Sequence, residues 1–269
     1  MTRRILIAVA AALLCAATLY AQPRLLAHRG GKAEQEENTL DAFKTTYAAG
    51  CHGFETDIHI TADGKYVIMH DGLLDRTTTG TGRIEQVESS YIRSITTKGG
   101  RPVPFLEDLL GYFKDCKGLY VEFEMKTNKE FYPEELLHKY CEDVYAMVTA
   151  AMPEDALFIF TSFDPRPLLY LRHAHPDAEV MYITGKPCSH ETVDLCVALG
   201  IGRLAATLNA SSRESVKYAH EKGLKVSLWP GEKCSDTHLA FLMGSDYLCS
   251  DIPLETIKYI RDNSLPIAY

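Results

Sequence analysis

Short apolar runs rich in β-branched and aromatic residues alternate along this chain with longer stretches of helical periodicity. The helical stretches carry start and stop signals, with Asn38 or Thr39 as an N-cap and glycine closing the segments that end at Gly50 and Gly223. The pattern predicts eight strands, at residues 24–30, 53–57, 119–126, 156–163, 178–184, 203–209, 224–230 and 246–251, and helices at 38–50, 104–116, 133–152, 166–176, 191–200 and 212–223.

Strands that alternate with helices in one chain predict a parallel sheet with helical crossovers. Eight such units in a 269-residue chain fit an α/β fold of the (β/α)8 TIM-barrel type, for which about 250 residues is typical. A doubly wound open sheet is the alternative. It needs fewer strands and leaves some of the apolar runs unexplained.

The segment GFETDIHITADGKYVIMHD adds a β-hairpin to this pattern. An Asp-Gly pair between two alternating apolar runs is the strongest short-range hairpin signal. If Asp63 and Gly64 are the two turn residues, Asp57 lies directly opposite His70. Glu55 and Asp57 share one face of their strand because side chains alternate with period two. The hairpin is therefore expected to gather two carboxylates and an imidazole at one spot.

Polar residues follow or end several of the predicted strands. In a TIM barrel the carboxyl ends of the strands form one face, and the active site lies there. One polar residue at a strand end means little, but a ring of them predicts a site. The ring consists of His28, Arg29, Glu55, Asp57, Glu124, Lys126, Ser162, Asp164, Trp229 and Asp251.

Glu55, Asp57 and Glu124 are candidate metal ligands. Three carboxylates at neighbouring strand ends repel one another unless a cation neutralises them, and ligation by oxygen alone favours Mg²⁺, Ca²⁺ or Mn²⁺ over zinc. The competing interpretation is that each carboxylate pairs with an arginine or caps a helix. Glu122 shares a strand and a face with Glu124 but lies one layer deeper, where we expect a supporting or salt-bridged group.

His28 and His70 are candidates for acid–base chemistry, because the unperturbed pKa of histidine, about 6.5, suits proton transfer near neutrality. Arg29 and Lys126 supply positive charge at the same rim. Together with a divalent cation they would clamp a phosphoryl group, so these residues point to a phosphate ester. Trp229 is either a core aromatic or an apolar wall against the substrate.

Charge and cysteine content narrow the function classes. The net charge is −8 and no run of Lys or Arg forms a basic stripe, which argues against nucleic-acid binding. The seven cysteines beyond Cys15 are odd in number and contain no CxxC pair, which argues against zinc ribbons and thioredoxin-like chemistry. The sequence is compatible with a disulfide bond, but it does not indicate which cysteines would form it.

The first 21 residues have the features of a secretory signal peptide. Arg3 and Arg4 precede the apolar run ILIAVAAALLCAATLY, and Ala21 stands at the expected cleavage site. We therefore expect an exported protein, periplasmic or extracellular, with residues 22–269 as a single domain and no stable membrane span after cleavage. An uncleaved N-terminal anchor is the alternative.

The ordered motifs AHRGG, EENTLDAF, GFETDIHITADGKYVIMHDGLLDRTTTGTG, VPFLEDLL, VEFEMK, FTSFD and SDIP resemble the glycerophosphodiester phosphodiesterase family. The resemblance implies a distorted TIM barrel with a small insertion at about residues 71–100. It also implies hydrolysis of small glycerophosphodiesters to glycerol 3-phosphate and an alcohol. By motif, the resemblance implies that His28 and His70 are the general acid/base pair and that Glu55, Asp57 and Glu124 bind one Ca²⁺ or Mg²⁺. It also implies that Arg29 and Lys126 bind phosphate. Glu37 and Trp229 would line the site.

Two departures from the family pattern affect the expected substrate. Glu36 replaces the usual proline before ENT and adds a negative charge near the entrance, and the sequence after Trp229 reads WPGEKC where WTVN is common. Two alternatives remain: the altered loop after Trp229 keeps the first open, and the presence of both histidines and all three carboxylates disfavours the second. One is a phosphodiesterase acting on a phosphoinositol, lysophospholipid or polyol-phosphate polymer. The other is a non-catalytic barrel that binds a phosphorylated ligand.

Overall fold

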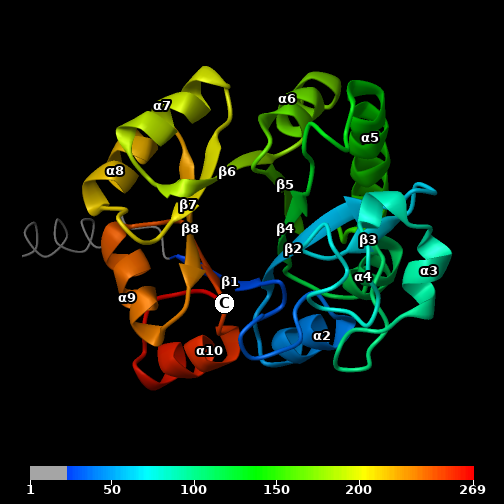
Figure 1. Ribbon diagram of the computed structural model, residues 1–269. Coiled ribbons are helices and arrows are strands. Elements are labelled where there is room, and N and C mark those ends of the chain that lie inside the picture. The colour runs from blue at the N-terminus through cyan, green and yellow to red at the C-terminus, as the bar shows by residue number, and fades with distance from the viewer. Residues whose placement is uncertain (1–22) are drawn as a thin grey trace, which may run out of the picture.

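The computed structural model describes residues 23–269, and in them eight parallel strands close into a barrel (Figure 1). Closure follows from β1 (Arg24–His28), which pairs with strands on both of its sides. The predicted TIM-barrel fold and all eight predicted strands are confirmed. The other seven barrel strands are β2 (Gly53–Ile60), β4 (Tyr120–Met125), β5 (Leu157–Ser162), β6 (Val180–Pro187), β7 (Arg203–Thr207), β8 (Lys225–Gly231) and β9 (Tyr247–Ser250).

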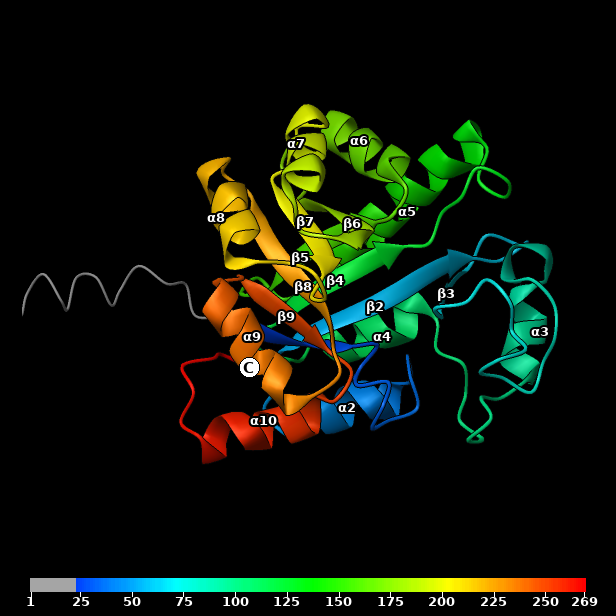
Figure 2. The ribbon, with the colours of Figure 1, turned by 60° about the vertical axis from the view of Figure 1, so that its left-hand side comes forward.

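A layer of helices surrounds the barrel (Figure 2). The six predicted helices are present, and two further helices follow β8 and β9. The second of these has Pro253 in its first turn, a start signal that the motif SDIP contained. The helices are α2 (Leu40–Ala48), α4 (Leu106–Phe113), α5 (Glu134–Ala151), α6 (Pro165–Ala174), α7 (His190–Ala198), α8 (Arg213–Glu221), α9 (Cys234–Met243) and α10 (Pro253–Asp262).

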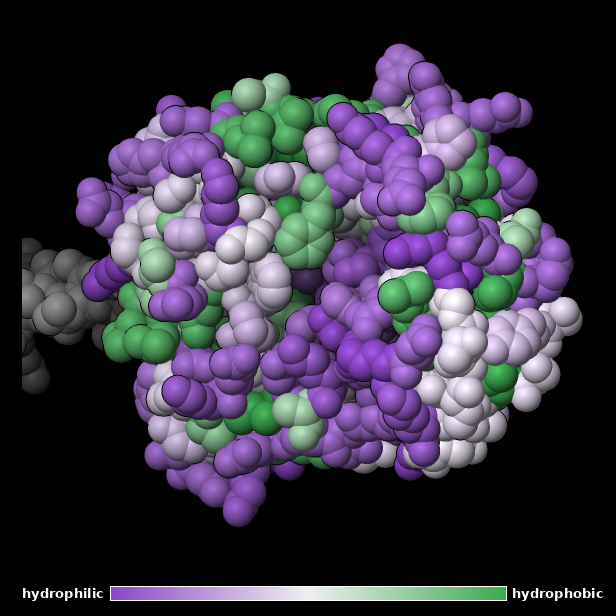
Figure 3. All heavy atoms as spheres, viewed as in Figure 1, coloured by the Kyte–Doolittle hydropathy of each residue, from purple (hydrophilic) through white to green (hydrophobic). Residues whose placement is uncertain are grey.

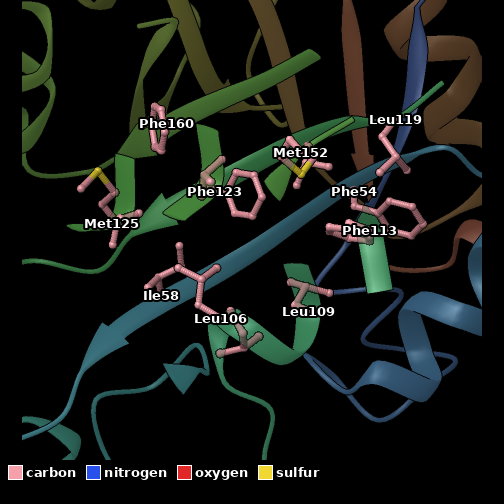
Figure 4. Packing of buried hydrophobic residues seen from close by; sticks show 14 of the residues in the cluster. Phe54, Ile58, Leu106, Leu109, Phe113, Leu119, Phe123, Met125, Met152 and Phe160 are labelled. Atoms are coloured by element: carbon pink, nitrogen blue, oxygen red, sulfur yellow. The ribbon is translucent and has the colours of Figure 1, made fainter. Parts of the chain in front are cut away.

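The largest core cluster lies between the strands and the helices. Figure 4 shows part of it, where Phe54 and Ile58 of β2 face Leu109 and Phe113 of α4. Because strand side chains alternate, this packing turns Glu55 and Asp57 of β2 toward the barrel interior. The core thereby fixes which residues of β2 reach the site.

The hairpin after β2 has a different register from the predicted one. β3 (Tyr66–Ile68) runs antiparallel to β2, with Ile58 opposite its last residue. The next position of the ladder places Asp57 opposite Met69, whose amide donates to the Asp57 carbonyl oxygen at 3.1 Å. The prediction that Asp57 lies opposite His70 is therefore wrong by one residue.

The observed register differs from the predicted one by one residue because the hairpin loop has three residues, 62–64, rather than two. The amide of Thr61 donates to the carbonyl of Lys65 at 2.8 Å and closes the ladder before the loop. Gly64 ends the loop with φ +77°, the left-handed conformation that three-residue hairpin loops need at this position. His70 follows the end of β3 in a bend, so its direction does not follow the alternation of the strand.

Residues 71–100 form the insertion between the hairpin and α4. They contain one turn of 3₁₀-helix, η1 (Ile84–Gln86), and the short helix α3 (Ser89–Ser94). Leu74, Ile84 and Ile92 pack with Val67 and Phe105 in a small apolar cluster separate from the main core. Figure 2 shows α3 beyond β3, to one side of the barrel.

Three sequence-based expectations concern the ends and the cysteines. The predicted signal peptide, residues 1–21, lies outside the described residues. Within residues 23–269, none of the helices combines the length and the apolar character needed to span a bilayer. All seven cysteines of this part of the chain are free thiols.

Candidate active site

A cleft of about 430 Å³ opens at the carboxyl ends of the strands. Figure 3 shows this face of the molecule, hollowed near its centre and mainly hydrophilic around the hollow. The cleft therefore lies where the ring of polar strand ends was predicted. Its lining includes His28, Arg29, Glu55, His70, Glu122, Glu124, Phe163 and Trp229.

Parallel pairing of β2 with β4 assembles the carboxylate trio. Asp57 stands beside Glu124 in the ladder, and Glu55 precedes Asp57 by two residues on the same face. One carboxylate oxygen from each of the three residues lies within 4.8 Å of the others, and all three side chains are buried. The structure thus brings together the three predicted metal ligands.

Burial and mutual repulsion oppose the simultaneous ionisation of the three carboxylates. Burial, together with the neighbouring carboxylates, holds the pKa of Glu55 well above its usual value. Burial and Asp57 raise the pKa of Glu124 to about 7, against the opposing effect of Lys126. Burial opposes ionisation of Asp57 as well, but Lys126, His70 and Arg29 lower its pKa. Asp57 is therefore the most readily ionised of the three carboxylates, and a bound cation would favour ionisation of the other two.

The donor set fits a hard divalent cation. Glu55 Oε1 and Asp57 Oδ1 are buried and accept no hydrogen bond within the described part of the chain. Buried polar atoms almost always have a partner, and Lys126 Nζ at 3.3 Å is the one ionic neighbour of Asp57 Oδ1 among the described residues, so both oxygens are available to a cation. Oxygen-only ligation suits Ca²⁺ or Mg²⁺.

Lys126, a predicted phosphate-binding residue, lies at the edge of the trio. Its Nζ atom is 2.7 Å from Glu124 Oε1 and 3.3 Å from Asp57 Oδ1. Burial opposes the charged ammonium, but these two carboxylates raise the pKa of Lys126. The ammonium is therefore a permanent positive charge beside the trio.

Arg29 lies between carboxylates on the other side of the trio. Its backbone adopts φ +53°, and its amide donates to Glu55 Oε2 at 3.1 Å. The guanidinium is 3.2 Å from Glu37 Oε1 and 3.7 Å from Asp57 Oδ2. The turn after β1 thus aims a fixed cation at the cleft while its own N–H orients a metal-ligand candidate.

His28 is held by a carboxylate from the other end of the chain. Its Nδ1–H donates to Asp251 Oδ1 at 2.5 Å, and the second oxygen of Asp251 is 3.0 Å from Lys32 Nζ. Burial lowers the pKa of His28, and the hydrogen bond to Asp251 opposes that effect. The other ring nitrogen of His28, Nε2, faces Glu55 and lies 3.8 Å from its Oε2 atom.

His70 has the same arrangement with a local partner. Its Nδ1–H donates to Asp71 Oδ1 at 2.7 Å. Arg76, from the insertion, binds the carboxylate of Asp71 and also donates to both oxygens of Glu37, at 2.6 and 2.8 Å. Burial lowers the pKa of His70, opposed by Asp57. The insertion therefore fixes the second histidine through a carboxylate–arginine pair.

Sequence reasoning assigned no role to Asp251, Asp71 or Arg76. Asp251 belonged to the ring of strand ends, and the other two lie in the quoted segments MHDG and LDRTTTG. The sequence suggested that Glu37 lines the site; the structure places it between Arg29 and Arg76. The positions of these residues in the motifs did not indicate that Asp251 would bind His28 or that Arg76 would bind Glu37.

Asn38 is another residue without a predicted function in the site. Its side-chain amide donates to Asp57 Oδ2 at 2.8 Å and accepts from the hydroxyl of Thr56 at 3.1 Å. Its backbone is left-handed, with φ +56°. Asn38 therefore fixes one oxygen of Asp57 and leaves the other for a ligand.

Trp229 and Phe163 form the apolar wall of the cleft. Their rings meet edge to face at 5.8 Å between centroids, and Trp229 also contacts the ring of His28 at 6.4 Å. Glu122 lies deeper, where burial raises its pKa to about 8, and it accepts a hydrogen bond from the hydroxyl of Tyr120 at 3.1 Å. It is a hydrogen-bonded group below the trio rather than a member of it.

The extra charge expected at Glu36 is paired. Its carboxylate accepts from Gly99 N at 2.7 Å and from Arg101 Nη1 at 2.8 Å. Glu36 therefore ties the end of the insertion to the loop before α2. It does not add a free negative charge at the cleft.

A family model described as the glycerophosphoryl diester phosphodiesterase family matches residues 28–255. The match covers most of the chain and includes the barrel mouth. The chain therefore belongs to this family, and it is an enzyme of the phosphoric diester hydrolase class.

Individual relatives agree with this assignment. A glycerophosphodiester phosphodiesterase of Caldanaerobacter subterraneus is 25% identical over 248 residues, covering 88% of this chain and 97% of the relative. Glycerophosphodiester phosphodiesterase 1 of Rattus norvegicus is 29% identical over 160 residues, which are 55% of this chain and about half, 48%, of that relative.

Solved structures show the same fold. An Oleispira antarctica phosphodiesterase, determined in complex with the product sn-glycerol-3-phosphate, has a TM-score of 0.78 at 22% identity, covering 89% of this chain and 97% of its own. A glycerophosphodiester phosphodiesterase of Parabacteroides distasonis also has a TM-score of 0.78, at 21% identity, covering 91% and 99% of the two chains.

Proposed function

We propose that this protein hydrolyses glycerophosphodiesters to glycerol 3-phosphate and an alcohol in a reaction that needs one divalent cation, Ca²⁺ or Mg²⁺. The single observation that carries the proposal is the convergence of three buried carboxylates, two carboxylate-held histidines and two cations at one barrel mouth. Such a set suits a phosphoryl group, on which negative charge grows during the reaction.

Glu55, Asp57 and Glu124 would hold the cation, which when bound would neutralise charge on the non-bridging oxygens. Arg29 and Lys126 bind the phosphoryl group from either side of the trio. Arginine supplies a planar pair of donors, and lysine a compact charge.

His28 and His70 act as the general acid/base pair. Each imidazole donates through Nδ1 to an aspartate, so the Nε2 atom is the one that exchanges protons with the reactants. One histidine takes the proton of the nucleophile and the other gives a proton to the leaving alcohol. The nucleophile is either water or the neighbouring glycerol hydroxyl. In the second case a cyclic phosphate forms first and is then hydrolysed.

The N-terminal sequence supports a periplasmic or extracellular place of action, where the substrates would be glycerophosphodiesters outside the cytoplasm. Fractionation of cells that express the full chain tests this part of the proposal. Recovery of the processed protein in the exported fraction supports it. Recovery of the full-length protein in the cytoplasm contradicts it.

His28→Ala and His70→Ala test the catalytic roles. Each variant should lose release of glycerol 3-phosphate by at least about 100-fold while keeping a native circular dichroism spectrum. His175→Ala is the matched control, because His175 pairs with the carboxylate of Glu142 on the outer helices. Unchanged turnover in His28→Ala would remove His28 from the mechanism.

A further inference from the structure

A second groove adjoins the catalytic cleft and shares His70, Glu124 and Phe163 with it. It has a volume of about 920 Å³. The segment after β4 lines one side of it and the start of the insertion, with Arg83, lines the other. The two hollows meet beside Glu124 of the carboxylate trio, so a phosphodiester bound at the trio would have room for one ester arm in each.

The sizes of the two hollows assign the arms. The cleft of about 430 Å³ ends in the barrel mouth above Glu122 and Ser227, which suits a small arm such as glycerol. The groove is the larger of the two hollows. It therefore suits the alcohol, the part of a glycerophosphodiester that varies in size.

Arg83 is the cation that distinguishes this groove. Its guanidinium lies over the ring of Phe131, 4.3 Å from the centroid, and its Nη1 is 3.6 Å from Glu85 Oε2. A Cβ atom on Gly72 would meet Nη1 at 2.7 Å, so the guanidinium packs directly against the backbone that follows His70 and Asp71. These contacts hold the side chain beside the catalytic segment.

Beyond its ion pair with Glu85, the guanidinium of Arg83 donates no hydrogen bond within residues 23–269, and 29% of the side chain is exposed. Its nearest carboxylate, Glu85, is almost fully buried: Oε1 accepts from His59 Nδ1 at 3.0 Å, and Oε2, which accepts no hydrogen bond within the described residues, is the oxygen 3.6 Å from Arg83. One nitrogen of the guanidinium faces Glu85 Oε2 at 3.6 Å, and its other N–H groups can donate to an oxygen-bearing ligand in the groove.

Of the remaining polar groups of the groove, Asn128 adds donors rather than an acceptor. Asn128 Oδ1 accepts from the amide of Phe131 at 2.9 Å, which leaves the NH₂ group of its side chain. Asp71 is bound by both His70 and Arg76, and Glu124 belongs to the trio. No carboxylate lining the groove in the described chain is therefore free to meet a cationic headgroup.

The phenylalanine ring that lines the groove does not suit a cationic headgroup either. Recognition of a quaternary ammonium needs aromatic faces that the ligand can cover. Lys126 Nζ already lies 5.9 Å from the centroid of this ring, Phe163, and Arg83 lines the same groove. A choline group there would meet two positive charges of the protein.

We propose that this groove is the subsite of the leaving alcohol and that it selects headgroups that present oxygen acceptors and carry no positive charge. The inference rests on the proposed hydrolysis of glycerophosphodiesters. Glycerol and inositol headgroups have the required chemistry, and choline and ethanolamine do not. Arg83 is the residue that makes the selection.

The test compares kcat/KM for glycerophosphoglycerol, glycerophosphoinositol, glycerophosphocholine and glycerophosphoethanolamine. The wild-type protein should favour the two polyol substrates by about tenfold. Arg83→Met should remove that preference, mainly through a higher KM for the polyol substrates. A preference for glycerophosphocholine, or an equal loss for all four substrates in Arg83→Met, would overturn the inference.

Arg93→Met is the matched control. Arg93 lies in the same insertion, has its guanidinium 3.9 Å from the ring centroid of Phe105, and pairs with Glu107. It has the same ring contact as Arg83 but does not line the groove. The substrate ratio should not change in this variant, and a change equal to that of Arg83→Met would overturn the inference.

A binding measurement separates this inference from the proposed function. Absence of glycerol 3-phosphate from all four substrates would contradict the proposed function. Calorimetry on His28→Asn protein in excess Ca²⁺ should still show about tenfold tighter binding of glycerophosphoinositol than of glycerophosphocholine. Adding Arg83→Met should abolish the difference. Equal affinities in the His28→Asn protein would overturn the inference.

Discussion

His28 and Asp251 are 223 residues apart in the chain, yet His28 Nδ1 lies 2.5 Å from Asp251 Oδ1. Each residue stands at the end of a strand, and the two strands are neighbours because β1 pairs with β9 where the barrel closes. Closure of the barrel therefore positions one of the two candidate acid/base groups. An imidazole held in this way has a fixed tautomer and a fixed direction.

Asp251→Asn should lower kcat by about 100-fold and change KM little. The asparagine keeps the size of the side chain but removes the charge that stabilises the protonated imidazole, and its effect should approach the loss expected from removing one acid/base group. Steady-state release of glycerol 3-phosphate measures both constants. Asp251→Glu should recover part of kcat, and a variant with a raised KM but normal kcat would indicate a binding role instead.

Arg76→Met should lower kcat/KM by roughly tenfold, because it frees Asp71 and Glu37 and so loosens His70 and Arg29 together. The melting temperature should change little, since Arg76 is half exposed. Arg101→Met is the control just after the insertion, because Arg101 binds Glu36 and Asp41 instead. Equal losses in both variants would assign Arg76 a purely structural role.

Ca²⁺ should raise the melting temperature of the wild-type protein, and Glu124→Gln should abolish this effect. A cation present at a hundred times its dissociation constant adds about 2.7 kcal/mol to the free energy of unfolding, which corresponds to roughly 5–10 °C in a domain of this size. The variant removes one of the three expected ligands, and thermal unfolding with and without Ca²⁺ measures the effect.

Glu122→Gln provides the matched control for the metal experiment. Burial raises the pKa of Glu122 to about 8, so this residue is largely protonated at neutral pH and glutamine resembles that form. Ca²⁺ should stabilise this variant as much as the wild-type protein. Loss of the shift in Glu122→Gln alone would move the cation site one layer deeper.

A pH-dependent contribution to stability should come from His220 and Asp246, away from the cleft. The hydrogen bond to Asp246 at 2.9 Å raises the pKa of His220, with burial opposing it. A raised folded-state pKa means that this stabilisation is complete below the unfolded pKa of about 6.5 and is lost as pH rises through the folded value. His220→Gln should therefore lose more stability at pH ~5.5 than at pH ~8.5 in urea unfolding. An equal loss at both values would exclude the linkage.

The barrel and the convergence of its strand ends were predictable because both follow from local patterns. Eight alternating units specify the closed sheet, and parallel pairing then places His28, Glu55 and Glu124 at one face without further information. The helices α9 and α10 were missed. They follow β8 and β9, where the eightfold repeat required a helix after each strand.

The remaining features depend on choices that local sequence does not fix. The run Ala62-Asp63-Gly64 is compatible with a two- or a three-residue loop, and the hydrogen bond between Thr61 and Lys65 decides for three. The pairing of Arg76 with Glu37 joins residues 39 positions apart through an irregular segment. Periodicity carries no information on such a contact.

The most direct measurement of the central claim is release of glycerol 3-phosphate from glycerophosphoinositol and glycerophosphocholine with Ca²⁺ or Mg²⁺, after chelation, and after the cation is restored. The account predicts release with a cation, loss after chelation and recovery on re-addition. Release that continues unchanged after complete chelation would contradict it. So would the absence of release from folded protein with the cation in excess.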